Sequence, residues 1–174
     1  MHVVVVSGLP CSGKTTLLAA LRAQLAWPAL AKDEYKELLF ANLGSGDRAW
    51  SRRLSTAAYA LLFAHAEQLL RCGQRCMVEF NFRWRERAGD FARLQAAGAE
   101  FVQLHCSAPA AALLARYRAR AGARHPGHVD RLAADEIEAE LRGPQTALPL
   151  AGKLIEIADP LDPAILPMLL ALNA

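Results

Sequence analysis

Residues 8–15 carry the strongest chemical signal in the sequence: they read Gly-Leu-Pro-Cys-Ser-Gly-Lys-Thr and match the pattern G-x-x-x-x-G-K-[ST]. The glycines at 8 and 13 let the backbone turn tightly, so that successive amide groups can converge on one anion. Lys14 is expected to bridge the β- and γ-phosphates of a nucleoside triphosphate, and the Thr15 hydroxyl to ligate Mg²⁺. The residues predicted to bind the nucleotide are Gly8, Pro10, Cys11, Ser12, Gly13, Lys14, Thr15 and Thr16. The alternatives are a turn that binds nothing and, for Cys11, a reactive thiol instead of a small filler.

The elements that must position this loop follow from the spacing of apolar residues. Strands are expected at five short apolar runs: His2–Ser7, Ala29–Lys32, Arg75–Phe80, Glu100–Cys106 and Lys153–Ala158. Helices are expected at Gly13–Ala26, Asp33–Asn42, Asp47–Gly73, Trp84–Ala97, Ser107–Ala121 and Ala133–Arg142, and after Asp162, where Pro167 should keep the helix bent or short. This alternation predicts one α/β domain over residues 1–174, a five-stranded, mostly parallel sheet flanked by helices. Ligands bind such sheets at the carboxyl ends of the strands.

Helical spacing also predicts which side chains are buried. In the long helix the residues expected to face the core are Trp50, Leu54, Ala57, Leu61, His65 and Leu69. In the helix before it they are Tyr35, Leu38, Leu39 and Phe40. The aromatic side chains interpreted as core, and not as platforms that stack on bases, are Trp50, Tyr59, Phe63 and Trp84.

Composition excludes several classes of protein. Of 174 residues, 53% are hydrophobic and 21% charged, which excludes a disordered chain. The net charge of +3 is too small to indicate nucleic acid as a partner. Four scattered cysteines do not form a disulfide framework or a zinc-binding spacing, and no signal peptide or membrane-spanning segment is expected. A cytoplasmic protein is therefore expected.

With these features in place, the chain resembles the small P-loop kinases, among them gluconate-kinase-like, chloramphenicol-phosphotransferase-like and zeta-toxin-like enzymes. The resemblance covers nearly the whole chain, and residues 8–15 are its one individually specific motif. It implies a parallel core, an acidic residue on the acceptor side after the second strand, and a lid that carries arginines. It also implies that the γ-phosphoryl group of ATP passes to a hydroxyl group in the presence of Mg²⁺.

Two carboxylates fall at positions that this resemblance marks. Asp33 matches the acceptor-side position and is interpreted as the base that takes the proton of the acceptor hydroxyl, with a helix cap as the alternative. Glu79 ends the third apolar run, where it could hold Mg²⁺ or bind the acceptor; the family often has Asp there, so both roles stay open. Glu34 is interpreted as a first-turn helix carboxylate. Further candidates for acceptor contacts are Asn81, Arg83 and Arg87, with a solvated helix face as the alternative for the arginines.

The lid is assigned to residues 116–130. Arg116 and Arg120 are four residues apart on one helix face, whereas Arg118 points away, and Arg124 begins the loop that would fold over the nucleotide. Arg116 is expected to contact the nucleotide, and Arg120 and Arg124 to stabilise charge on the γ-phosphate, with a solvated basic helix as the alternative. After the fifth strand, the resemblance places Ala158-Asp159-Pro160 where related kinases pass near adenine, with an ordinary turn as the alternative.

These residues together predict an ATP- and Mg²⁺-dependent phosphotransferase that acts on a hydroxyl-bearing small molecule, with Lys14, Asp33, Arg120 and Arg124 as catalytic residues and Thr15 and Glu79 at the metal. One alternative is a nucleotide-binding ATPase or switch protein without an acceptor. Another is a 5′-hydroxyl polynucleotide kinase, which would need a stronger basic track than this chain has. The sequence does not identify the acceptor or the preference for ATP over GTP.

Overall fold

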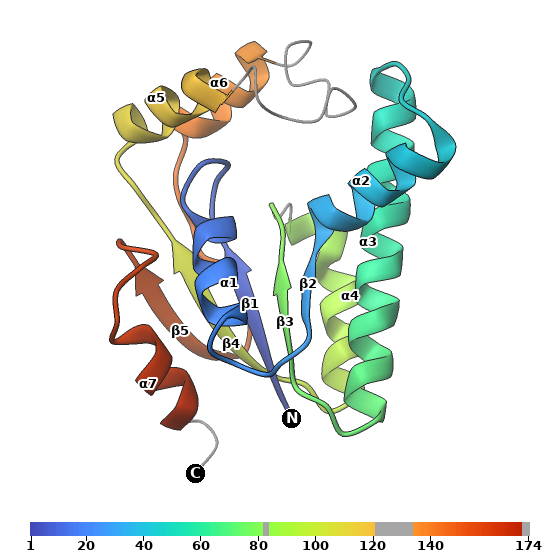
Figure 1. Cartoon of the computed structure of the whole chain (residues 1–174), viewed down its shortest axis with the longest axis vertical. Coiled ribbons are helices and arrows are strands. Elements are labelled where there is room, and N and C mark those ends of the chain that lie inside the picture. The colour runs from blue at the N-terminus through green and yellow to red at the C-terminus, as the bar shows by residue number, and fades with distance from the viewer. Residues whose placement is uncertain (82–83, 121–133, 172–174) are drawn as a thin grey trace.

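The computed structural model describes residues 1–81, 84–120 and 134–171 as alternating strands and helices (Figure 1). In chain order these elements are β1 (His2–Ser7), α1 (Lys14–Arg22), β2 (Ala29–Ala31), α2 (Lys32–Leu43), α3 (Arg48–Arg71), β3 (Cys76–Glu79), α4 (Trp84–Ala96), β4 (Glu100–Cys106), α5 (Ala110–Arg120), α6 (Ala134–Arg142), β5 (Gly152–Ile157) and α7 (Ile165–Leu170). The sheet has the order β2-β3-β1-β4-β5, and every neighbouring pair is parallel. The predicted α/β fold with a five-stranded parallel sheet is therefore confirmed.

The central strand β1 is buried on both faces. Val3 and Val5 pack into a core with α3 and α4, whereas Val4 and Val6 pack into a second core with α1 and α7. Figure 1 shows these two helix pairs on opposite sides of the sheet. All four valines are 0% exposed, which explains why β1 is a continuous run of β-branched residues without polar alternation.

Helices α5 and α6 lie together beyond the carboxyl ends of the strands (Figure 1). Leu113 and Tyr117 of α5 and Leu141 of α6 form a small buried cluster, against which Leu9 and Cys11 of the loop after β1 pack. Arg48 at the start of α3 forms an ion pair with Glu136 of α6. The helices above the sheet are thus joined both to the phosphate loop and to the α2–α3 side.

The buried face of α3 differs by one residue from the predicted stripe. Its buried side chains are Ser51, Leu54, Ala58, Leu62, Phe63, Ala66 and Leu70. Leu61 is 48% exposed and His65 is exposed, so both were predicted wrongly. Residues 61–63 are all apolar, so periodicity alone allows either face. The observed face places the small side chain of Ala66 in the core with the valines of β1 and buries Phe63 beside Phe80 and Phe91.

Helix α2 buries Phe40, and Tyr35 in part, as predicted, but it differs from the prediction at Lys36 and Leu38. Lys36 and Phe40 are buried, whereas Leu38 is 63% exposed. The Lys36 ammonium donates to Ser51 Oγ at 2.8 Å and lies 5.2 Å from the centre of the Phe40 ring. Helix α2 packs against α3, and this packing gives the buried Lys36 ammonium a hydrogen-bond acceptor. A pattern of apolar residues does not predict a buried lysine.

Several element boundaries differ from the predicted ones. Helix α1 ends at Arg22 and not near Ala26, and α5 begins at Ala110, beyond the predicted cap at Ser107. Asp47 caps α3 as expected, since its side chain accepts from the Trp50 backbone N–H at 2.8 Å. Helix α7 is short, as Pro167 predicted. Within the described ranges, no helix combines the length and apolar character needed to cross a membrane.

The position of the α3 face can be tested with two adjacent leucines. Leu62→Ala should lower the free energy of unfolding by about 2–5 kcal/mol, because Leu62 is fully buried. Leu61→Ala is the matched control and should change it by no more than about 0.5 kcal/mol. Urea denaturation measures both, and equal losses or the reverse order would contradict the packing of α3.

Candidate active site

The loop between β1 and α1 turns tightly because glycine occupies two positions where no other residue would fit. Gly8 has φ of 136°, and a Cβ added there would lie 2.2 Å from the carbonyl oxygen of Cys106. Gly13 has φ of 100°, and its Cβ would lie 3.0 Å from Pro160 Cγ. Cys11 adopts the left-handed region with φ of 65°. The loop therefore turns tightly against the ends of β4 and β5.

Lys14 is held inside this loop. Its side chain is buried, and Nζ donates to the carbonyl oxygen of Leu9 at 2.7 Å. Burial lowers the pKa of Lys14, and the nearby Glu79 carboxylate opposes this shift. The N-cap of α1 is Gly13, which supplies no side-chain hydrogen bond. The first N–H groups of α1 are therefore ready to receive an anion beside the Lys14 ammonium.

A cavity of about 340 Å³ opens above the loop. Its lining residues are Pro10, Cys11, Gly13, Lys14, Thr15, Thr16, Asp33, Glu79, Asn81, Arg116, Arg120 and Pro160. Most residues selected from the sequence thus meet in one place. Gly8 and Ser12 belong to the loop but do not line this cavity, and Arg83 and Arg124 lie outside the described residues.

The two predicted carboxylates lie on the wall formed by the ends of β2 and β3. Glu79 is 6% exposed, and burial raises the pKa of its carboxyl, while Lys14 opposes the shift. Asp33 is the second residue of α2, whose N-cap is Ala31, so the alternative interpretation of Asp33 as the helix cap is wrong. Lys32 Nζ contacts Asp33 Oδ1 at 2.9 Å. Glu34 is paired with Arg22 of α1, and it does not line the cavity.

Two arginines of α5 approach the phosphate loop from above. Arg116 Nη1 donates to the carbonyl oxygen of Cys11 at 3.2 Å. Arg120 lines the cavity with its Nε buried and without a hydrogen-bond partner among the described residues. Arg118 turns toward α6, where it forms an ion pair with Glu138 at 3.0 Å. An unpartnered buried guanidinium nitrogen at this position suits an anion in the cavity.

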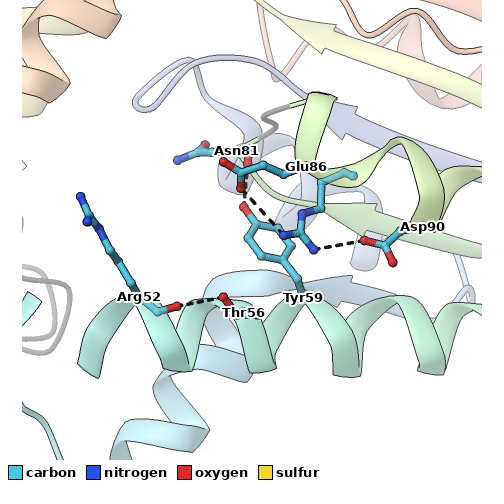
Figure 2. Close-up of polar contacts among 7 residues, drawn as sticks. Arg52, Thr56, Tyr59, Asn81, Glu86 and Asp90 are labelled. Atoms are coloured by element: carbon cyan, nitrogen blue, oxygen red, sulfur yellow. Dashed lines mark hydrogen bonds and ion pairs between the residues drawn. The ribbon is translucent and has the colours of Figure 1, made fainter. Parts of the chain in front are cut away.

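The far wall of the cavity is fixed by α3. Figure 2 shows the Tyr59 hydroxyl pointing to the backbone carbonyl of Asn81, to which it donates at 2.7 Å. Arg87 lies over the Tyr59 ring at 4.4 Å and pairs with Asp90 at 3.1 Å. Arg87 is therefore absent from the cavity lining among the described residues, although the sequence made it a candidate for acceptor contact. Asn81 does line the cavity.

The donor set fits a triphosphate with Mg²⁺. Lys14, Arg120 and the free N–H groups of α1 suit phosphate oxygens, and the Thr15 hydroxyl and Glu79 carboxylate are hard oxygen ligands of the kind Mg²⁺ takes. In the described part of the chain, no three His, Cys, Asp or Glu side chains group to hold a metal. A cation here would therefore need phosphate or water oxygens as further ligands.

Two features of the region had no signal in the sequence. One is the contact between Lys32 and Asp33. These residues are adjacent, and the start of α2 decides whether their side chains meet. Below the loop, Ser7, Gln103 and His105 form a buried polar cluster: Ser7 Oγ lies 3.0 Å from His105 Nδ1 and 2.7 Å from the Gln103 amide. These residues lie on neighbouring strands β1 and β4, so only the sheet register brings them together.

Comparisons with known proteins agree with this geometry. The family described as "AAA domain" matches residues 3–144. A putative kinase from Chloroflexus aurantiacus is 34% identical, with a TM-score of 0.88 over 98% of this chain and 97% of that one. The APS kinase of Mycobacterium tuberculosis, solved with AMPPNP and APS, shares the fold at 18% identity, with a TM-score of 0.63 over 99% of this chain and 98% of that one. A sugar kinase from Janibacter sp. HTCC2649 is likewise 18% identical, with a TM-score of 0.56 over 99% and 92% of the two chains.

No curated protein matches the sequence. The family match nevertheless spans most of the chain, and the resemblance to small P-loop kinases is confirmed. The chain therefore belongs to the AAA domain family, within the group of small P-loop kinases.

Proposed function

We propose that the protein is an ATP- and Mg²⁺-dependent phosphotransferase that moves the γ-phosphoryl group of ATP to a hydroxyl group of a small molecule. The observation that supports this most strongly is that one and the same cavity is lined by Lys14, Asp33, Glu79, Arg116 and Arg120. A site that only bound nucleotide would need the loop and the arginines, but not a carboxylate on the acceptor side. The cytoplasmic location remains a prediction from the use of cysteine in the sequence.

In the proposed reaction the acceptor oxygen attacks the γ-phosphorus, and the bond between that phosphorus and the β–γ bridging oxygen breaks. The electron pair leaves with ADP, and the proton of the acceptor hydroxyl passes to an Asp33 carboxylate oxygen. Lys14, Arg116 and Arg120 balance the charge on the phosphate oxygens. Thr15 and Glu79 would hold Mg²⁺, which supplies further positive charge at the β- and γ-phosphates. The lid role of Arg124 stays a prediction, because Arg124 lies outside the described residues.

Removal of the Lys14 ammonium tests the phosphate site. Lys14→Ala should reduce ATP-dependent transfer by at least about 100-fold, because the loop loses its only side-chain cation. ADP release, measured across a panel of hydroxyl-bearing metabolites and nucleosides, reports the rate. Lys153→Ala, on the exposed start of β5, is the control and should match the wild type. Unchanged transfer in Lys14→Ala would remove the phosphate-site assignment.

The role of Asp33 can be separated from nucleotide binding. Asp33→Asn should leave ATP affinity close to that of the wild type and slow transfer by about 10²–10⁴-fold, because the amide cannot accept the proton. Glu34→Gln is the matched control, since Glu34 lies next in sequence but is paired with Arg22. Equal transfer rates in Asp33→Asn and the wild type would exclude Asp33 as the base and reduce it to a structural residue.

Burial of Glu79 predicts how the Mg²⁺ requirement depends on pH. Because its pKa lies above the ordinary value, the carboxyl gains a proton as the pH falls while an exposed glutamate would still be ionised. Protons and Mg²⁺ then compete, so the Mg²⁺ concentration for half-maximal activity should rise as the pH falls. In Glu79→Gln, the part of this rise that comes from protonation of Glu79 should be absent. ATP titrates equally in both proteins, so comparing the two removes its contribution. Parallel curves would exclude Glu79 from the metal site.

A further inference from the structure

A second cavity, of about 130 Å³, borders the start of the phosphate loop. Gly8, at the end of β1, and Thr146, in the segment after α6, form part of its wall. Asn81 lines both this cavity and the larger one. The second cavity therefore adjoins the larger one at Asn81, beside the region where the proposed function places the acceptor.

The inner wall of this cavity is polar and held in place. His105 is 3% exposed, with Nδ1 at 3.0 Å from Ser7 Oγ and Nε2 at 3.2 Å from the carbonyl oxygen of Gln145. The Gln145 side chain accepts from the Ala108 N–H at 3.1 Å and donates to the Ala108 carbonyl at 2.7 Å. These bonds fix the segment after α6 against the start of α5. Polar walls of this kind hold water or a polar group, whereas apolar cavities stay dry.

Three side chains around the cavity remain available for a ligand. The Glu140 carboxylate forms no ion pair or hydrogen bond with the described residues, whereas the carboxylate of its neighbour Glu138 is paired with both Arg118 and Arg142. The carbonyl of Asn81 is taken by Tyr59, and Figure 2 shows its side-chain amide pointing away from that ring. The Thr146 hydroxyl likewise has no partner among the described residues.

The charge of the cavity indicates what it can bind. Among the described residues that line it, Glu140 is the only one with a formal charge. The cations of the site, Lys14, Arg116 and Arg120, line the larger cavity. A carboxylate or phosphate in the second cavity would meet Glu140 without a compensating cation, whereas an ammonium or hydroxyl group would find an acceptor.

We propose that the second cavity binds an amine- and hydroxyl-bearing end of the acceptor, with Glu140 as the residue that selects an ammonium group over a carboxylate. This inference rests on the proposed function, because it assigns the acceptor to that same site. The hydroxyl that receives the phosphoryl group lies toward Asp33, and the amine-bearing end lies against Glu140, Asn81 and Thr146. The acceptor is then an amino-polyol and not a sugar acid.

Three six-carbon probes test this selection: the amino sugar glucosamine, the neutral sugar glucose and the sugar acid gluconate. Isothermal titration calorimetry on the full chain with Mg²⁺ and saturating AMPPNP gives each affinity. Glucosamine should bind tightest, glucose about two- to fivefold more weakly, since Glu140 is exposed, and gluconate most weakly. Glu140→Gln should reduce glucosamine to the affinity of glucose, Glu140→Lys should favour gluconate, and Glu138→Gln on the same helix should leave the order unchanged.

Several outcomes would overturn the inference: tightest binding of gluconate to the wild type, an unchanged order in Glu140→Gln, or no binding of any probe although AMPPNP binds. Each of these leaves the phosphate site intact. Failure of AMPPNP itself to bind would instead overturn the proposed function, so the two failures are distinguishable. ADP release with ATP and the tightest-binding probe adds the check that the bound probe is an acceptor.

Discussion

The site depends on one physical constraint, the burial of a positive charge inside a tight loop. Lys14 is only 5% exposed, and burial lowers the pKa of its ammonium group. A buried charge costs several kcal/mol unless charges or dipoles balance it, and here the Leu9 carbonyl and the Glu79 carboxylate do so in part. A triphosphate would complete the balance, because its oxygens can accept from Lys14 and from the free N–H groups of α1.

The parallel sheet brings the other charges to this lysine. All five strands run in one direction, so their carboxyl ends meet at one edge, where Asp33 and Glu79 follow β2 and β3. Helix α5 is packed onto the loop through the small cluster that includes Leu113, and it delivers Arg116 and Arg120 from above. Segments far apart in the sequence thus form a cavity with cations on one side and carboxylates on the other.

The sequence allowed prediction of features that local chemistry determines. The phosphate loop requires glycines at two backbone positions, and an all-valine run requires burial on both faces. Features that packing decides were harder to predict. Nothing in the run 61–63 distinguishes Leu61 from Leu62, because the choice depends on which face lets α3 approach the sheet. The second cavity was not predicted, because Asn81 and Glu140 come from separate elements and form no motif. Residues whose role depends on a motif can be found from sequence, whereas residues whose role depends on spatial neighbours cannot.

The central claim is that the buried Lys14 ammonium and its loop bind the phosphates of a nucleotide. Isothermal titration calorimetry of Mg-ATP into the wild-type protein tests it most directly, because it needs no acceptor. The account predicts saturable binding of one nucleotide per chain, competed by ADP. An absence of heat with both Mg-ATP and Mg-GTP, together with no shift in melting temperature at saturating nucleotide, would contradict it.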